Sequence, residues 1–167
     1  MPKKCVFVKK IRENADKTVS DRPNFKKSLY IASGKNTRTM KKEKIHIEYL
    51  LNASSRSILW NAISTPIGME DWFADKVQMK DKTFIFTWGK SEVREAEMIA
   101  TRMHSFVRFH WKDDEDEKSY FEFKINYNEL TGDYVLEITD FVDPEERNDQ
   151  SELWGSQIDT LKRACGM

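Results

Sequence analysis

The chain has 167 residues, which is the usual size of one domain and is enough to bury a core without disulfides or structural metals. Aromatic residues make up 12% and charged residues 34%, as in globular proteins. No apolar run approaches the ~18 residues of a membrane span. The two cysteines, Cys5 and Cys165, do not form a disulfide framework, so we expect a reducing, cytoplasmic environment. This composition excludes membrane-spanning proteins and small disulfide-stapled folds.

The net charge of zero hides two oppositely charged parts. Residues 1–42 hold thirteen Lys and Arg but three acids, whereas residues 43–167 carry a net charge of −10. We predict that residues 1–42 are a basic leader that is flexible or not native, since Met40 also resembles a natural start. Thirteen cations could contact phosphates, but the leader has few aromatic residues for base stacking, which argues against nucleic acid as a partner. Residues 43–167 are expected to form the domain.

The domain begins with a strand and two helices. Apolar and polar residues alternate over residues 43–51, which predicts a half-buried strand. Ser54 or Ser55 can cap a following helix. Pro66 ends that helix and suits the first turn of a second, short helix that is expected to reach Phe73.

Six short strands are predicted to follow. Turn signals separate segments of alternating apolar and polar residues, which is typical of an antiparallel sheet with one wet face. The predicted strands lie at residues 76–79, 84–88, 92–102, 107–111, 121–127 and from 134 onward. We interpret the acidic stretch Asp113–Glu117 as a solvated loop between two of these strands.

A long helix is predicted at the carboxyl end. Pro144 opens a pattern in which Trp154, Ile158, Leu161 and Cys165 follow the spacing of one helix face. The order is therefore β-α-α-β6-α. A sheet whose apolar face is covered by one long helix is an α+β arrangement.

Four stretches in this order resemble a known family. They are residues 53–63 with a tryptophan near the helix centre, Thr65-Pro66 followed by residues 69–73, residues 107–111, and residues 153–162. Residues 43–164 resemble the START-like (Bet v 1-like, SRPBCC) superfamily, and most of all the branch of the activator of Hsp90 ATPase. The resemblance implies a helix-grip fold, in which a curved antiparallel sheet wraps around a long C-terminal helix with a groove between them. It implies no particular substrate, because this fold hosts carriers, receptors, cyclases and co-chaperones.

Large aromatic side chains dominate the positions expected to face that helix. Pockets for small ligands are mostly apolar with a few placed polar groups, so these rings are candidates for a ligand-binding cavity. The ten candidates are Trp72, Phe84, Phe86, Trp88, Phe109, Trp111, Phe121, Phe123, Tyr127 and Trp154. The polar candidates inside are Tyr49, Tyr127, Tyr134 and Asp140. The alternative is that the rings simply fill the core.

Catalytic signatures are scarce in the sequence. His46 and His110 are expected to face solvent, and His104 is the third histidine. We find no nucleophile elbow, phosphate-binding loop or dinucleotide fingerprint, and no recognisable metal-ligand spacing. We therefore predict no catalytic residues, no metal and no cofactor.

The sequence thus predicts a non-enzymatic binding domain with a cavity for a small apolar ligand. A protein–protein module like the activator of Hsp90 ATPase, with a chaperone or another protein as partner, is the first alternative. An enzyme of cyclase or hydrolase type is the second, and it requires a titratable group inside the cavity such as Asp140. The sequence leaves open whether the protein is a monomer or a homodimer.

Overall fold

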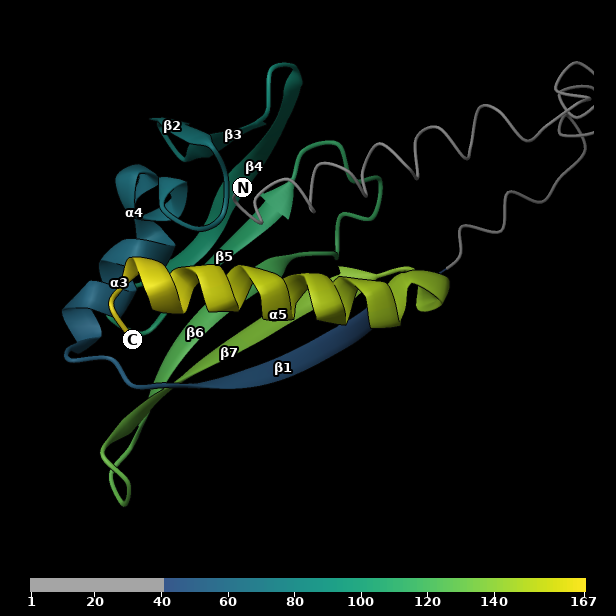
Figure 1. Ribbon diagram of the computed structural model, residues 1–167. Helices are drawn as coiled ribbons and strands as arrows, with labels where there is room; N and C mark the ends of the chain where they lie inside the picture. The colour runs from purple at the N-terminus through teal and green to yellow at the C-terminus, as the bar shows by residue number, and fades with distance from the viewer. Residues whose placement is uncertain (1–40) are drawn as a thin grey trace, which may run out of the picture.

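The computed structural model describes residues 41–167, and the predicted leader lies outside this range except for Lys41 and Lys42. Seven strands form one antiparallel sheet in the order β1-β7-β6-β5-β4-β3-β2 (Figure 1). The strands are β1 (Glu43–Leu51), β2 (Lys76–Lys80), β3 (Thr83–Trp88), β4 (Glu92–Arg102), β5 (Phe106–Trp111), β6 (Phe121–Asn128) and β7 (Asp133–Val142). The first and last strands in sequence pair directly, so β1 closes against β7.

The helices lie at one end and across one face of this sheet. They are α3 (Arg56–Ser64), α4 (Pro66–Glu70), the short 3₁₀ helix η1 (Pro144–Glu146) and α5 (Arg147–Ala164). Helix α5 runs across the sheet, and α3 and α4 lie near its C-terminal end (Figure 1). The predicted order and the α+β helix-grip fold are confirmed. One boundary was wrong, because α4 ends at Glu70 and Phe73 follows in a turn.

Thr65 lies between α3 and α4, and its backbone and side chain form hydrogen bonds to both helices. Its backbone N–H and its hydroxyl donate to the carbonyl of Asn61, which closes α3. The same hydroxyl accepts from the N–H of Gly68, which caps α4 at a distance of 3.1 Å. The two helices therefore approach so closely that a Cβ at Gly68 would lie 2.1 Å from the Asn61 oxygen.

We expect Gly68→Ala to destabilise the protein, because the added methyl group meets backbone atoms that cannot move aside. The cost should be at least the ~1–3 kcal/mol typical of overpacking. Gly155→Ala is the matched control. Its Cβ would be 3.9 Å from the Tyr49 hydroxyl, and alanine favours the interior of α5 by up to ~1 kcal/mol. Urea denaturation followed by circular dichroism should show opposite shifts, and equal midpoints for the two variants would contradict this packing.

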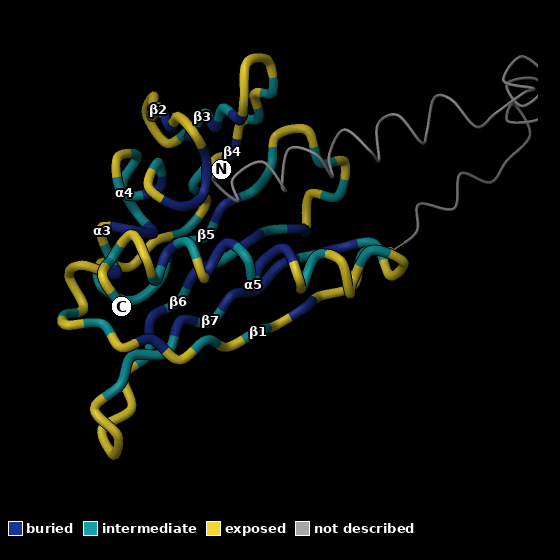
Figure 2. The backbone as a smooth tube through the Cα atoms, viewed as in Figure 1, coloured by how far each residue is buried: buried dark blue, intermediate teal, exposed yellow. Residues whose placement is uncertain are grey.

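The core lies between the sheet and α5 (Figure 2). Three indole N–H groups are satisfied there by hydrogen bonds, as buried tryptophans require. Trp72 donates to the Ala62 carbonyl and Trp88 to the Phe73 carbonyl, both at 2.8 Å. The first bond holds the turn after α4 to α3, and the second holds that turn to β3. The third indole, that of Trp154, donates to Asp140 at 2.9 Å. Within residues 41–167, none of the helices has the length and apolar character that crossing a membrane would require.

Candidate functional site

Aromatic rings pack tightly between the sheet and α5. Seven of the predicted cavity residues are at most 1% exposed, namely Trp72, Phe84, Phe86, Trp88, Phe109, Phe121 and Phe123. Phe73 lies at the centre of this cluster. Its ring contacts six other rings at centroid distances of 5.0–6.2 Å. These seven side chains therefore fill the core.

The other three predicted cavity residues have different surroundings. Trp154 on α5 is buried, and Trp111 at the end of β5 is half-buried. Tyr127 is 45% exposed and packs against Tyr134 at a ring distance of 5.0 Å, on the hairpin of β6 and β7. Of the other polar candidates, Tyr49 is half-buried, and burial raises the pKa of its hydroxyl.

A cavity of about 250 Å³ lies beside the filled core, at the N-terminal end of α5. Helix α5, the end of β7 and the loop between β5 and β6 enclose it. Four aromatic residues line it, namely Phe73, Trp111, Phe141 and Trp154. Two of them, Trp111 and Trp154, are among the ten predicted residues. Phe73 is not among the ten, although the sequence placed it at the end of the predicted second helix beside Trp72, which is among them.

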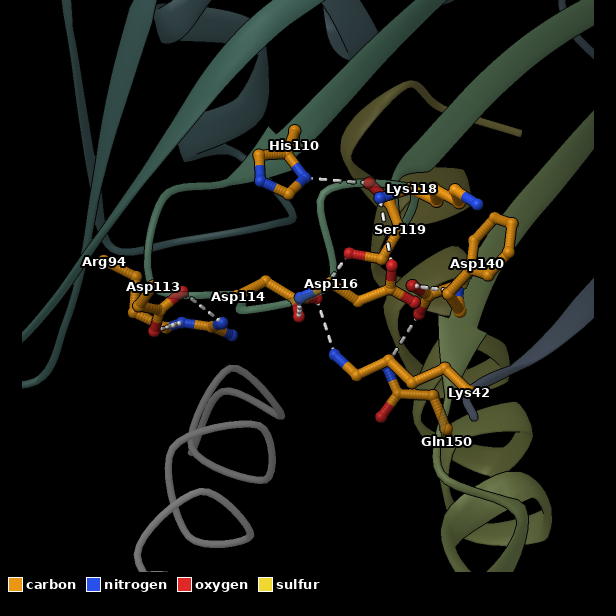
Figure 3. Close-up of polar contacts among 11 residues, drawn as sticks. Lys42, Arg94, His110, Asp113, Asp114, Asp116, Lys118, Ser119, Asp140 and Gln150 are labelled. Atoms are coloured by element: carbon orange, nitrogen blue, oxygen red, sulfur yellow. Dashed lines mark hydrogen bonds and ion pairs between the residues drawn. The ribbon is translucent and has the colours of Figure 1, made fainter. Parts of the chain in front are cut away.

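Asp140 is the buried polar group of this cavity. It lies on β7 at an inward-facing position and is 7% exposed. Its Oδ2 accepts from Gln150 Nε2 at 3.1 Å (Figure 3). The same oxygen accepts from Trp154 Nε1 at 2.9 Å, and Oδ1 accepts from the N–H of Phe141 at 2.8 Å. Gln150 and Trp154 are one helical turn apart, so Asp140 holds the first half of α5 against β7.

Burial raises the pKa of Asp140 from its ordinary value of 3.8 to about 6. The hydrogen bonds from Trp154, Phe141 and Gln150 and the charge of Lys42 act in the opposite direction, but they do not offset the loss of solvation. Asp140 is one of the four interior polar candidates predicted from the sequence, with Tyr49, Tyr127 and Tyr134. The structure places it in the cavity wall.

Lys42 and the loop after β5 form the outer part of the cavity wall. The Lys42 ammonium lies 2.5 Å from Asp114 Oδ2, which also accepts from the Ser119 hydroxyl (Figure 3). Burial alone would raise the pKa of Asp114. The hydrogen bonds from Lys42, Ser119 and the Asp116 backbone, with the charge of Lys42, outweigh burial and lower it. Asp114 was interpreted as part of a solvated loop, but its side chain is only 8% exposed.

Arg94 covers the remaining side of the cavity. It lies on β4 opposite Phe86, and its guanidinium carbon is 4.0 Å from the centroid of the Trp111 ring. Arg94 Nε and Nη2 donate to the two oxygens of Asp113 at 2.9 and 2.8 Å. Arg94 therefore forms a cation–π contact with Trp111 while Asp113 serves as its counter-ion. Sequence periodicity places Arg94 on the inner face of β4, but only the fold brings it over Trp111.

The histidines lie elsewhere. His46 is on the outer sheet face, where its ligating atoms and those of Glu48 and Glu137 are within 4.8 Å of one another. Lys124 donates to Glu137 at 2.9 Å, so this cluster already contains a cation. His110 is half-buried and donates through Nδ1 to the Ser119 carbonyl at 2.8 Å. The strands of His46 and His110 are separated by β7 and β6.

Comparison with known proteins places this geometry in a family. The profile of the START-like superfamily domain matches residues 39–167. The solution structure of BfR322 from Bacteroides fragilis is 65% identical, covers 77% of this chain and 94% of its own, and superposes with a TM-score of 0.56. A search of proteins with curated functions finds no match.

More distant structures share the fold. The Aha1 dimer from Colwellia psychrerythraea is 14% identical over 74% of this chain and 96% of its own, with a TM-score of 0.61. DynU16, from the dynemicin biosynthetic locus, is 12% identical over 72% of this chain and 46% of its own, with a TM-score of 0.59. The match to the family profile over residues 39–167 shows that the chain belongs to the START-like superfamily.

Proposed function

We propose that this domain is a binding module that holds a small molecule in the cavity beneath the first turns of α5. The observation that carries the proposal is the composition of the cavity wall, in which Phe73, Trp111 and Trp154 face a few converging polar groups. Ligand sites typically combine such a wall with a few placed polar atoms. The volume of about 250 Å³ is below the ~300–1,000 Å³ of drug-sized sites, which favours a one-ring ligand over a long acyl chain.

The hydrogen bonds of Asp140 favour binding over catalysis. The carboxylate already accepts three bonds, which fix β7 to α5. Binding needs one further contact with this carboxylate, whereas acid–base catalysis also needs a second titratable group at the reacting atom, and none of the three histidines lines this cavity. The cyclase- or hydrolase-like alternative is therefore less well supported than a non-enzymatic binding domain.

A protein-binding module is the second candidate. Met103 is 74% exposed and Tyr127 is 45% exposed, and together with Arg56 they line an open hollow at the α3 end of the sheet. Methionine, tyrosine and arginine are enriched where proteins contact one another. This hollow and the α5 cavity have no lining residue in common, so the two candidate functions can be tested separately.

The binding proposal can be tested with three probes that share a phenyl ring and a two-carbon linker. They are 2-phenylethanol, phenethylamine and 3-phenylpropionate, titrated into the full chain by NMR. At least one should shift the indole N–H signal of Trp154, which lies in the cavity wall. If none of the three shifts this signal at millimolar concentration, the proposal fails.

A cavity-filling variant checks the location of the site. Val142→Phe places a ring inside the cavity, so we expect the affinity of the best probe to fall by at least about tenfold. Val135→Phe is the matched control, because residues 135 and 142 lie on opposite faces of β7. Equal affinities for the two variants would place the ligand elsewhere.

A further inference from the structure

Carboxylates outnumber cations around the cavity. A wider hollow of about 750 Å³ shares Lys42, Asp114, Asp143 and Glu146 with it. Together the two are lined by eight acids and three bases. The acids are Asp113, Asp114, Glu115, Asp116, Asp140, Asp143, Glu145 and Glu146, and the bases are Lys41, Lys42 and Arg94. A concave surface lined by one sign of charge raises the local concentration of oppositely charged solutes.

Two of these three bases already have counter-ions. Arg94 is held by both oxygens of Asp113, and Lys42 lies 2.5 Å from Asp114. An anionic ligand would have to break one of these pairs and would then lie among the carboxylates of the described lining. The described lining therefore disfavours carboxylate or phosphate ligands and favours a cation.

Asp140 provides an acceptor at the inner end. An ionised carboxylate has about four lone-pair sites, and the three donors to Asp140 use three of them. One site on Oδ1 remains for an N–H of a ligand. A buried acid is costly to ionise alone, so a ligand cation would gain a charge-assisted bond and relieve that cost.

The aromatic wall is compatible with positive charge. Arg94 already lies over the Trp111 ring at 4.0 Å, which shows that a planar cation fits at this face. Phe73 and Trp154 offer further ring surface deeper in the cavity. A ligand with one charged end and one ring could contact the carboxylates with its charge and the aromatic side chains with its ring.

We propose that the ligand is a small protonated amine attached to one aromatic or compact apolar group. Its ammonium lies near Asp140 and Asp143, and its ring lies against Phe73 and Trp154. This inference rests on the proposed binding function and narrows the ligand from any one-ring small molecule to a cationic one. The carboxylates of the wider hollow attract the ligand cation before it reaches Asp140.

The three phenyl probes test whether the site prefers a cationic, a neutral or an anionic ligand. Phenethylamine should bind at least about tenfold more tightly than 2-phenylethanol, and 3-phenylpropionate should bind most weakly. An alcohol or acid that matches the amine would overturn the inference but leave the binding function intact. Failure of all three probes would instead overturn the binding function.

A variant and a pH series test the role of Asp140. Asp140→Asn should remove most of the preference for the amine over the alcohol, while the control Asp159→Asn, an exposed position on α5, should keep it. Circular dichroism establishes whether Asp140→Asn is folded. An unchanged preference in the folded variant would contradict the assignment of the ammonium to Asp140.

The pH series needs no variant and decides the matter if Asp140→Asn does not fold. The amine stays protonated, but Asp140 gains a proton below about pH 6, so the preference should fall between about pH 7.5 and about pH 5. The charged groups around this site are Lys42, Asp114, Asp143, Glu146 and the Arg94 pair. Since the pKa of Asp114 is already lowered, the change near pH 6 is assigned to Asp140, and a constant preference would overturn the assignment.

Discussion

Replacing Phe73 by alanine is expected to lower the free energy of unfolding by about 3–5 kcal/mol, which is among the largest costs of a single core substitution. The ring is 1% exposed and contacts six other aromatic rings from the turn after α4, the sheet and α5. Neighbouring rings are rigid, so the space left behind closes poorly. A domain with 5–15 kcal/mol of stability would lose a large share of it.

Urea denaturation of both proteins measures this loss. Tyr127→Ala is the control, because it removes an even larger aromatic side chain from a position that is 45% exposed. Its cost should stay near the ~1 kcal/mol of one aromatic pair, since Tyr127 packs against Tyr134. A Phe73→Ala loss below 2 kcal/mol would show that the core relaxes around the missing ring, which tight ring packing does not allow.

The strands and the long helix could be predicted from the sequence because each has a regular period. In β6, residues 121, 123 and 125 are apolar and buried, and the residues between them are polar. In α5, Trp154, Ile158 and Leu161 follow one helix face, and all three are buried. The alternation of residues along β7 also predicted that Asp140 is inside, because it shares the inner face of the strand with Ile138.

The cavity could not be predicted in the same way. Periodicity shows which face a residue occupies but not how far the covering helix extends, so Tyr127 has the inward register of β6 yet is exposed. Lys42 and Asp114 are 72 residues apart, and both belong to segments whose composition indicated solvent. Only the antiparallel register of β1 with β7, and of β7 with β6, brings these two charges to one cavity.

Asp140 should make the stability of the protein depend on pH in a direction opposite to that of most acids. Its pKa is about 6 in the folded protein against 3.8 ordinarily, so the folded state binds more protons between these values. The stabilisation by protonated Asp140 is complete below about pH 3.8 and is lost as pH rises to about 6. A shift of about two pKa units corresponds to about 3 kcal/mol.

The difference between wild type and Asp140→Asn isolates this effect. The variant keeps a similar shape and does not titrate, although its amide cannot accept as many bonds from Trp154 and Gln150. That fixed loss is the same at every pH. From about pH 4 to about pH 7, the stability of wild type should therefore fall by about 2 kcal/mol relative to the variant, because part of the change lies below pH 4.

Asp114→Asn gives the opposite control. Because the pKa of Asp114 is lowered in the folded protein, its contribution is present at neutral pH and is lost on acidification. Wild type should therefore lose stability relative to Asp114→Asn as pH falls, whereas it gains stability relative to Asp140→Asn. Urea midpoints of the three proteins at four pH values measure both dependences of stability on pH.

Parallel plots of stability against pH for wild type and Asp140→Asn would mean that the buried carboxylate is solvated in the folded protein. The cavity would then contain more water than its aromatic wall implies.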